Sequence, residues 1–276
     1  MIKAIFFDID GTLISIRKHL IPESTLKAVA AVRRRGVLTF LCTSRAVQFL
    51  SNIPGIGYDG LVCLTGAHCL DKGRKDIHCY GMNPDDVAAA VLDCQRRDEP
   101  IIALASDMIY VHNPMSPAVL NALATGGLKP GDVSGGFLPF PDLGNVSSAA
   151  DVISGLGILQ MTGFFHSGEE EERMMALMPD SHTERWTEDF VDIIGNGASK
   201  ALGLEVMAEH FGFTPEEAMA IGDGANDISI IRRAGIGIAM GNASPEVREA
   251  ADYVTADVDD DGLAKALIKY FPDLFD

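Results

Sequence analysis

Two aspartates near the N-terminus have the spacing of a reactive or cation-binding pair. Asp8 and Asp10 follow the apolar run of residues 2–7 and precede the turn at Gly11. Residues i and i+2 of an extended chain point to the same face, so both carboxylates are expected on one side of a strand end. Carboxylates delivered by a buried strand are costly unless they bind a cation, react, or are satisfied within the turn. The pair alone leaves these alternatives open.

A second acidic group follows an apolar segment near the C-terminus. Asp223 and Asp227, with Asn226 between them, come after residues 218–221 and precede a predicted helix. If both acidic groups lie at the carboxyl edge of one parallel sheet, four carboxylates converge and repel one another, which a divalent cation resolves. Oxygen ligands without His or Cys favour Mg²⁺. We therefore predict a Mg²⁺ site at this edge, which is compatible with a helix-capping role for Asp223 or Asn226.

Hydroxyl and positive groups suited to an anion occur at two other places. Thr43, Ser44 and Arg45 follow another apolar run and offer hydroxyls, backbone N–H groups and a guanidinium. Lys200 lies in the first turn of a predicted helix, where the helix dipole disfavours a cation. That placement favours an anionic partner for Lys200, with an ordinary exposed lysine as the alternative.

The elements that must position these residues alternate between strands and helices. Apolar runs predict buried strands, and capping residues with helical periodicity predict helices between them. The strands are expected at 2–7, 37–42, 218–221, 236–240 and 251–255, and the helices from 22, 199 and 244 and over 262–270, with one more ending at 233. Repeated strand–helix–strand units predict an α/β fold with a doubly wound, mostly parallel, Rossmann-like sheet.

The middle of the chain does not continue the strand–helix alternation of its two ends, which predicts an inserted module. We expect the core in two parts, residues 1–81 and 189–276, with an α+β domain over 82–188 between them. Its predicted elements are helices at 85–97 and 169–178, strands at 101–105, 109–112, 157–165 and 184–194, and a mobile rim or surface loop at 126–148.

Composition excludes several classes of protein. The 276 residues are 47% hydrophobic with a net charge of −17, which suits a globular protein and opposes binding to nucleic acid or anionic lipid. Five cysteines without a C-x-x-C pair indicate reduced thiols rather than disulfides or a closed zinc site. Because we find neither a signal peptide nor an apolar run near ~20 residues, we expect a cytoplasmic protein without membrane or nucleic-acid partners.

Taken together, the motifs resemble those of the haloacid dehalogenase superfamily of phosphohydrolases. Four motifs occur in the expected order: FFDIDGTL at 6–13, Thr43-Ser44-Arg45, Ser199-Lys200, and GDGAND at 222–227. The tail, with AMGNA at 239–243, ADYVT at 251–255 and DDG at 260–262, is similar to the Cof-type subgroup, subclass IIB. The resemblance covers about residues 1–71 and 189–271 and implies that the inserted module is a cap that closes over the substrate.

The resemblance implies a mechanism and a role for each motif residue. Asp8 is the expected nucleophile that forms an aspartyl-phosphate, Asp10 the acid/base, and Thr43 and Lys200 the groups that hold the phosphoryl oxygens. Mg²⁺ is expected at Asp8, the Asp10 carbonyl and Asp223, with Asp227 steadying its waters. The residues expected to contact substrate are Gly11, Ser44, Arg45 and Asn226.

The implied activity is Mg²⁺-dependent hydrolysis of small phosphorylated metabolites, with sugar phosphates first among them, by a monomer or small homo-oligomer. A phosphomutase or phosphotransferase using the same intermediate is the alternative, and a non-catalytic binding protein is a third class. One residue departs from the subgroup pattern: Thr65-Gly66-Ala67 stands where Asn-Gly-Ala is usual. Any role of that Asn amide is therefore lost here.

Overall fold

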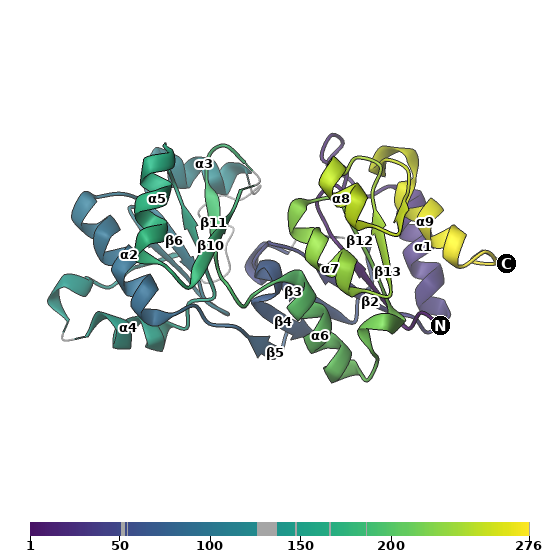
Figure 1. Cartoon of the computed structure of the whole chain (residues 1–276), viewed down its shortest axis with the longest axis horizontal. Coiled ribbons are helices and arrows are strands. Elements are labelled where there is room, and N and C mark those ends of the chain that lie inside the picture. Colours follow the sequence, from purple (N-terminus) through teal and green to yellow (C-terminus); the bar gives the residue numbers. More distant parts are fainter. Residues whose placement is uncertain are drawn as a thin grey trace. The chain divides into compact units, whose positions relative to one another are not determined.

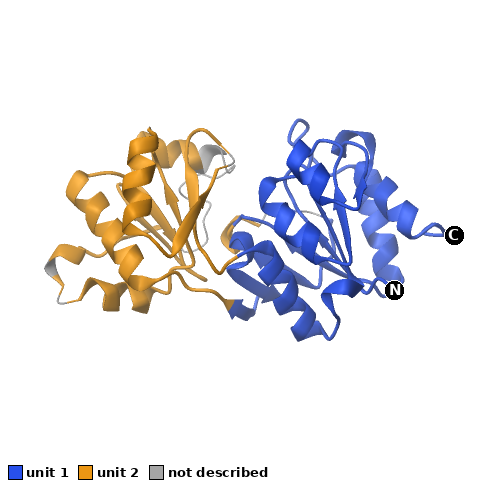
Figure 2. Cartoon of the chain, viewed as in Figure 1, with its two compact units in different colours: residues 1–45, 52–78, 199–276 blue, residues 46–51, 79–198 orange. Residues whose placement is uncertain are grey.

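The computed structural model describes residues 1–275 except 51, 52, 54, 126–136, 147, 166 and 186. The chain forms two compact units, which Figure 2 distinguishes by colour. Unit 1 comprises residues 1–45, 52–78 and 199–276, and unit 2 comprises 46–51 and 79–198. Each unit has its own β-sheet. The long segment of unit 2 begins at Cys79, three residues before the expected module, and unit 2 also includes 46–51. It continues to Ala198 because strand β11 (Val191–Gly195) pairs with two strands of its sheet.

The sheet of unit 1 has the order β14-β13-β12-β1-β2-β3-β4-β5. From β14 to β3 all neighbours are parallel, and β4 runs antiparallel to β3. The strands are β1 Ala4–Phe7, β2 Leu38–Cys42, β3 Gly60–Cys63, β4 His68–Asp71, β5 Asp76–Cys79, β12 Ala218–Gly222, β13 Ile236–Ala239 and β14 Tyr253–Val254. The predicted parallel-rich α/β sheet is confirmed.

Helices cover both faces of this sheet. They are α1 Glu23–Arg34, α6 Lys200–Phe211, α7 Ile228–Arg233, α8 Pro245–Ala250 and α9 Gly262–Tyr270. Helix α1 packs against α9, and α6 packs against α7; Figure 1 shows these two pairs on opposite sides of the sheet. Ser199 caps the start of α6 through its side chain, where the sequence predicts a helix to begin, and Gly212 ends the helix in the left-handed conformation.

The core of unit 1 fixes the strand ends. All four residues of β1 are buried, and Phe6 stacks on Phe40 of β2 with ring centroids 4.7 Å apart. Leu204 and Met207 of α6 belong to the same buried cluster. Burying a side chain of this size contributes roughly 1.5–3 kcal/mol, so the sheet and α6 form a rigid support for the loops that leave the strands.

Unit 2 is an α+β unit with a mostly antiparallel sheet in the order β10-β11-β9-β6-β7-β8. Its strands are β6 Ile101–Leu104, β7 Ile109–His112, β8 Phe137–Pro139, β9 Gln160–Gly163, β10 Ser181–Glu184 and β11 Val191–Gly195. Its helices are α2 Pro84–Arg97, α3 Pro117–Thr125, α4 Ala149–Leu156 and α5 Gly168–Leu177. Helix α2 packs against both α4 and α5. In the part of the chain that the structure describes, no helix has the length and apolar character to cross a membrane.

One predicted strand of unit 2 needs correction. The expected strand over 157–165 is shorter, because helix α4 occupies 149–156 and ends at Gly157 in the left-handed conformation. The strands expected over 184–194 are β10, which begins earlier at Ser181, and β11, and the two pair antiparallel. Of the expected loop at 126–148, residues 126–136 and 147 lie outside the described residues, and the remainder includes β8 and a 3₁₀ turn.

Candidate active site

Three neighbouring strands of unit 1 deliver polar residues to one edge of the sheet. Asp8 directly follows β1, Thr43 follows β2 and Asp223 follows β12. The parallel register aligns Phe7 with Ile221 on one side and with Leu41 on the other. The three strands therefore end at the same level, which is where open α/β sheets bind ligands.

Lys200 joins two of the carboxylates. Its side chain is completely buried, and Nζ lies 2.7 Å from Asp8 Oδ1 and 2.6 Å from Asp227 Oδ1. Gly66 holds the start of α6 in place: its φ is +93°, and a Cβ there would lie 1.9 Å from the carbonyl oxygen of Ser199. The alternative of an exposed lysine is thus excluded, and the cation stands between two acidic groups.

Asp227 organises the loop that carries Asp223. While Oδ1 accepts from Lys200, Oδ2 accepts the backbone N–H groups of Asp223 at 3.0 Å and Gly224 at 2.9 Å. Both oxygens of this buried carboxylate are therefore engaged by the protein.

Asp223 is held by residues from two other loops. The Thr12 hydroxyl donates to Oδ1 at 2.8 Å, and the Asn242 amide donates to Oδ2 at 3.0 Å. Gly11 packs directly on the same carboxylate: its φ is +89°, and a Cβ would lie 2.1 Å from Asp223 Oδ2. Only glycine fits there, both for its backbone conformation and for the space available.

Asp10 forms a two-pronged ion pair with Arg45. Arg45 Nε lies 2.7 Å from Asp10 Oδ2, and Nη2 lies 2.5 Å from Oδ1. The Arg45 N–H also donates to Thr43 Oγ1 at 3.1 Å. The planar guanidinium thereby fixes the direction of the Asp10 carboxylate.

The remaining predicted residues lie in the same loops. Ser44 is half-buried between Thr43 and Arg45, and Asn226 is half-buried in the 3₁₀ turn Ala225–Asp227. The sequence did not single out Thr12 or Asn242. Thr12 stands within the first motif, and Asn242 follows the end of β13, a position at the same edge that could have marked it as a candidate.

The site carries an excess of negative charge. Four carboxylates lie together with two cations: Lys200 pairs with Asp8 and Asp227, and Arg45 pairs with Asp10. The fourth carboxylate, Asp223, is held by Thr12 and Asn242. We call Asp8, Asp10, Asp223, Asp227, Lys200 and Arg45 the carboxylate cluster. The formal excess is two negative charges, the amount that one divalent cation balances.

Burial changes the acidity of the cluster. It raises the pKa of Asp8 well above the ordinary value, although the Lys200 ammonium opposes the shift. It also raises the pKa of Asp223 to about 6, against the Thr12 hydrogen bond. For Lys200, burial acts to lower the pKa, but Asp227 and Asp8 outweigh it and the pKa lies well above the ordinary value. Lys200 is therefore charged, and the two aspartates lack sufficient compensating charge.

The geometry suits a hard divalent cation. Carboxylate oxygens of Asp8, Asp223 and Asp227 lie within 4.8 Å of one another. Asp227 accepts three hydrogen bonds, from Lys200 and two backbone N–H groups, whereas each oxygen of Asp223 accepts one. Asp8 and Asp223 therefore keep more lone pairs for a cation. An all-oxygen donor set with an excess of two negative charges fits Mg²⁺.

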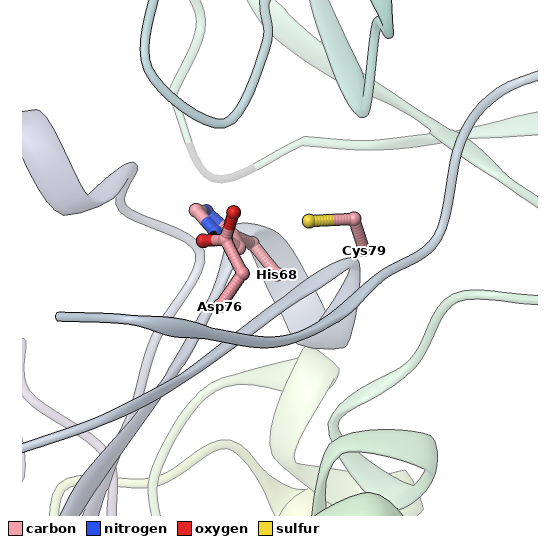
Figure 3. A group of neighbouring side chains, drawn as sticks. All are labelled: His68, Asp76 and Cys79. Carbon is pink, nitrogen blue, oxygen red and sulfur yellow. Dashed lines mark hydrogen bonds and ion pairs between the residues drawn. The ribbon is translucent and has the colours of Figure 1, made fainter.

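A second group, His68, Asp76 and Cys79 along β4 and β5, also has metal-ligating atoms close together (Figure 3). His68 Nε2 lies 2.7 Å from Asp76 Oδ1, and Nδ1 is buried with no partner among the described residues. A metal bound at Nε2 would leave the proton on Nδ1 without an acceptor, whereas metal-bound imidazoles normally donate that proton. We interpret the His68–Asp76 contact as a structural hydrogen bond.

Comparison with known proteins shows the family of the chain. A family model described as haloacid dehalogenase-like hydrolase matches residues 5–267. The Bacillus subtilis protein YkrA, whose name carries a provisional assignment as a phosphatase, is 31% identical over 266 residues, 96% of each chain.

Solved structures are similar to this chain over nearly its whole length. The chain is similar to BT4131, described as a subclass IIB sugar phosphatase, with 33% identity, a TM-score of 0.81 and coverage of 98% of this chain and 99% of that one. It is also similar to a structure from work on a trigonal-bipyramidal intermediate in a phosphoryl-transfer superfamily, with 34% identity, a TM-score of 0.79 and 99% of each chain covered.

Proposed function

Because the chain belongs to the haloacid dehalogenase-like hydrolases and is a phosphatase, we propose that it hydrolyses small phosphorylated metabolites through a phosphoryl group transferred to Asp8. Sugar phosphates are the proposed substrate class, supported by the similarity to the sugar phosphatase BT4131. The observation that carries the mechanism is Asp8 itself, a buried carboxylate at a strand end with one oxygen held by Lys200.

In the first step, a carboxylate oxygen of Asp8 forms a bond to phosphorus while the bond to the leaving alcohol breaks. Asp10, which must release one oxygen from the Arg45 ion pair and carry a proton there, donates that proton to the alcohol. In the second step, Asp10 takes a proton from water, the water attacks the phosphorus, and inorganic phosphate leaves as the Asp8 carboxylate is restored.

Residues around Asp8 are proposed to bind the phosphoryl group and the substrate. Lys200 and the Thr43 hydroxyl are proposed to contact the phosphoryl oxygens, and Gly11, Ser44, Arg45 and Asn226 are proposed to contact the substrate. Each such donor in a preorganised site stabilises the transition state by ~3–4 kcal/mol. Mg²⁺, when bound by Asp8, Asp223 and the Asp10 carbonyl near Asp227, supplies positive charge that offsets the negative charge of the phosphate.

The test is phosphate release from p-nitrophenyl phosphate and a panel of hexose, pentose and nucleotide phosphates, with Mg²⁺ or with EDTA. We expect turnover that needs Mg²⁺ and falls at least about 10³-fold in Asp8→Asn. The exposed Asp273→Asn change in the same unit is the matched control and should leave turnover unchanged.

Two results would change the proposal. Turnover that survives Asp8→Asn would exclude Asp8 as the nucleophile. Phosphate release only when a second sugar hydroxyl or a bisphosphate primer is present would identify a phosphotransferase or phosphomutase instead.

A further inference from the structure

Asn242 contacts the proposed metal ligand Asp223 and also forms hydrogen bonds with two other segments of unit 1. It follows β13, and its side-chain amide makes three hydrogen bonds. Nδ2 donates to Asp223 Oδ2 at 3.0 Å and to the Gly11 carbonyl at 2.9 Å, while Oδ1 accepts the Val258 N–H at 3.0 Å. One side chain therefore connects the loops after β1, β12 and β13 with the 3₁₀ turn Val258–Asp260.

The three contacts specify asparagine. The two donors require an –NH₂ group, and the third contact requires an acceptor on the same short side chain. Aspartate would lose both donors and place a second carboxylate beside Asp223 Oδ2, and leucine would lose all three contacts.

The backbone around Asn242 holds its amide in position. The Met240 N–H donates to the Gly222 carbonyl at 2.9 Å, and the Gly241 N–H donates to the Ala256 carbonyl at 2.9 Å. The loop is thus attached to the end of β12, the strand that carries Asp223.

Asp223 is consequently held on both oxygens. Thr12 bonds Oδ1, Asn242 bonds Oδ2, and Gly11 packs against Oδ2 from the loop whose carbonyl Asn242 also binds. A carboxylate oxygen has two lone pairs, so an oxygen that accepts one hydrogen bond still has a site for a cation. Partners of this kind fix the direction of a ligand, and their loss typically lowers metal affinity about 10–100-fold.

We infer that Asn242 is a positioning residue that orients Asp223 for a divalent cation, acting through Asp223 and not on the substrate. The inference rests on the proposed function, which places Mg²⁺ at Asp8 and Asp223. Because the Asn242 side chain is exposed to solvent, water partly replaces the lost donor, and we expect the lower end of the range.

The experiment measures Mg²⁺ binding directly by isothermal titration calorimetry, without substrate. Asn242→Ala should raise the Kd for Mg²⁺ about tenfold. Asn242→Ser, whose hydroxyl is too short for both donor contacts, should do the same and guards against a folding defect in the first variant. Ser24→Ala is the matched control, because it removes one exposed hydrogen bond, to Asp261, in the same unit and should leave the Kd unchanged.

A second readout separates positioning from a structural role. The free energy of unfolding of each variant is measured in EDTA, and kcat is measured at saturating Mg²⁺. A positioning residue shifts the Mg²⁺ Kd and leaves kcat at saturation within a few-fold of wild type. A loss of stability with an unchanged Kd would overturn the inference while the proposed function stands, whereas wild type that binds no Mg²⁺ would overturn both.

Discussion

The two units use charged residues for different purposes. In unit 2, Arg173 of α5 pairs with Asp93 and with Glu99 at 2.5 Å, and Arg97 also contacts Asp93 at 3.2 Å. Charges in this group are balanced and partly exposed to solvent. In unit 1 the carboxylate cluster gathers an excess of two negative charges, with Lys200 completely buried among them. Figure 2 locates the two units.

Backbone conformation differs in the same way. In unit 2, Asp98 and Asn113 adopt the left-handed conformation, with φ of 58° and 53°, and such short polar residues tolerate it. In unit 1, Leu64 and Thr65 adopt it with φ of 49° and 50°, directly before the Gly66 turn that packs on α6. Leucine and a β-branched residue adopt this conformation at a cost of roughly 1–2 kcal/mol each.

These differences in charge and backbone conformation indicate which unit contains the destabilising features. The ion pairs of unit 2 balance one another, so they leave no uncompensated charge in that group. Unit 1 keeps unbalanced charge and backbone strain next to Lys200, where a cation and a phosphate would relieve the charge.

The largest effect is expected from removing the buried cation. Lys200→Met leaves Asp8 and Asp227 without their common partner, so activity at saturating Mg²⁺ should fall about 10²–10³-fold. The free energy of unfolding in EDTA should fall by on the order of 3 kcal/mol. Phosphate release and urea denaturation are the measurements. Lys265→Met, an exposed lysine of α9, is the control, and a variant of Lys200 that keeps activity within tenfold would show a purely structural ion pair.

The next largest effect is expected on the free energy of unfolding in EDTA, which should depend on pH. Asp223 has a pKa of about 6 in the folded protein because it is buried, and about 3.9 when unfolded. Between these values the folded state binds more protons, so the free energy of unfolding should fall as pH rises from about 4 to about 6, by on the order of 2 kcal/mol. Denaturation in EDTA at several pH values measures it.

One variant and one group of unit 2 control the pH experiment. Asp223→Asn should remove the part of the slope that Asp223 contributes and leave the part from Asp8, whose pKa burial also raises. In unit 2, burial acts to raise the pKa of Glu171, but hydrogen bonds from Thr183 and Arg185 outweigh it and the pKa is lowered. Its contribution to stability is therefore present above its ordinary pKa and lost as pH falls, the opposite sign. An unchanged slope in Asp223→Asn would show that another group is responsible.

Much of this site could be predicted from the sequence, because its residues stand at strand ends. An apolar run followed by Asp8 or Asp223 marks both a buried strand and the edge where it ends. Ser199 and Gly212 likewise mark the limits of α6. These signals are local, so single residues carry them.

The pairing of side chains across loops could not be predicted. Nothing in the sequence relates Arg45 to Asp10 or Asn242 to Asp223, since these contacts depend on how separate loops pack. Helix α4 escaped prediction for another reason: Gly155 and Gly157 within and after it, next to a Gly- and Ser-rich passage, lower its local helix propensity. Its packing against α2 stabilises it in the fold.

A smaller effect should follow from relieving backbone strain in unit 1. Thr65→Asn places a residue that tolerates the left-handed conformation at φ 50°, ψ 35°, so the free energy of unfolding should rise by about 1 kcal/mol. The reverse change in unit 2, Asp98→Thr, should lower it by at least about as much. Denaturation of both variants gives the comparison, and a destabilised Thr65→Asn would mean that contacts of Thr65 outweigh its strain.

The smallest effect is expected from the balanced charges of unit 2. Arg173→Met removes the cation between Asp93 and Glu99, but Arg97 remains at 3.2 Å from Asp93 and solvent reaches the group. Partly exposed ion pairs contribute little, so the free energy of unfolding should fall by about 0.5–1 kcal/mol. Activity at saturating Mg²⁺ should be unchanged, in contrast to Lys200→Met. If Arg173→Met instead lowered kcat as strongly as Lys200→Met, the charges of unit 2 would also serve the reaction, and the division of roles between the two units would be wrong.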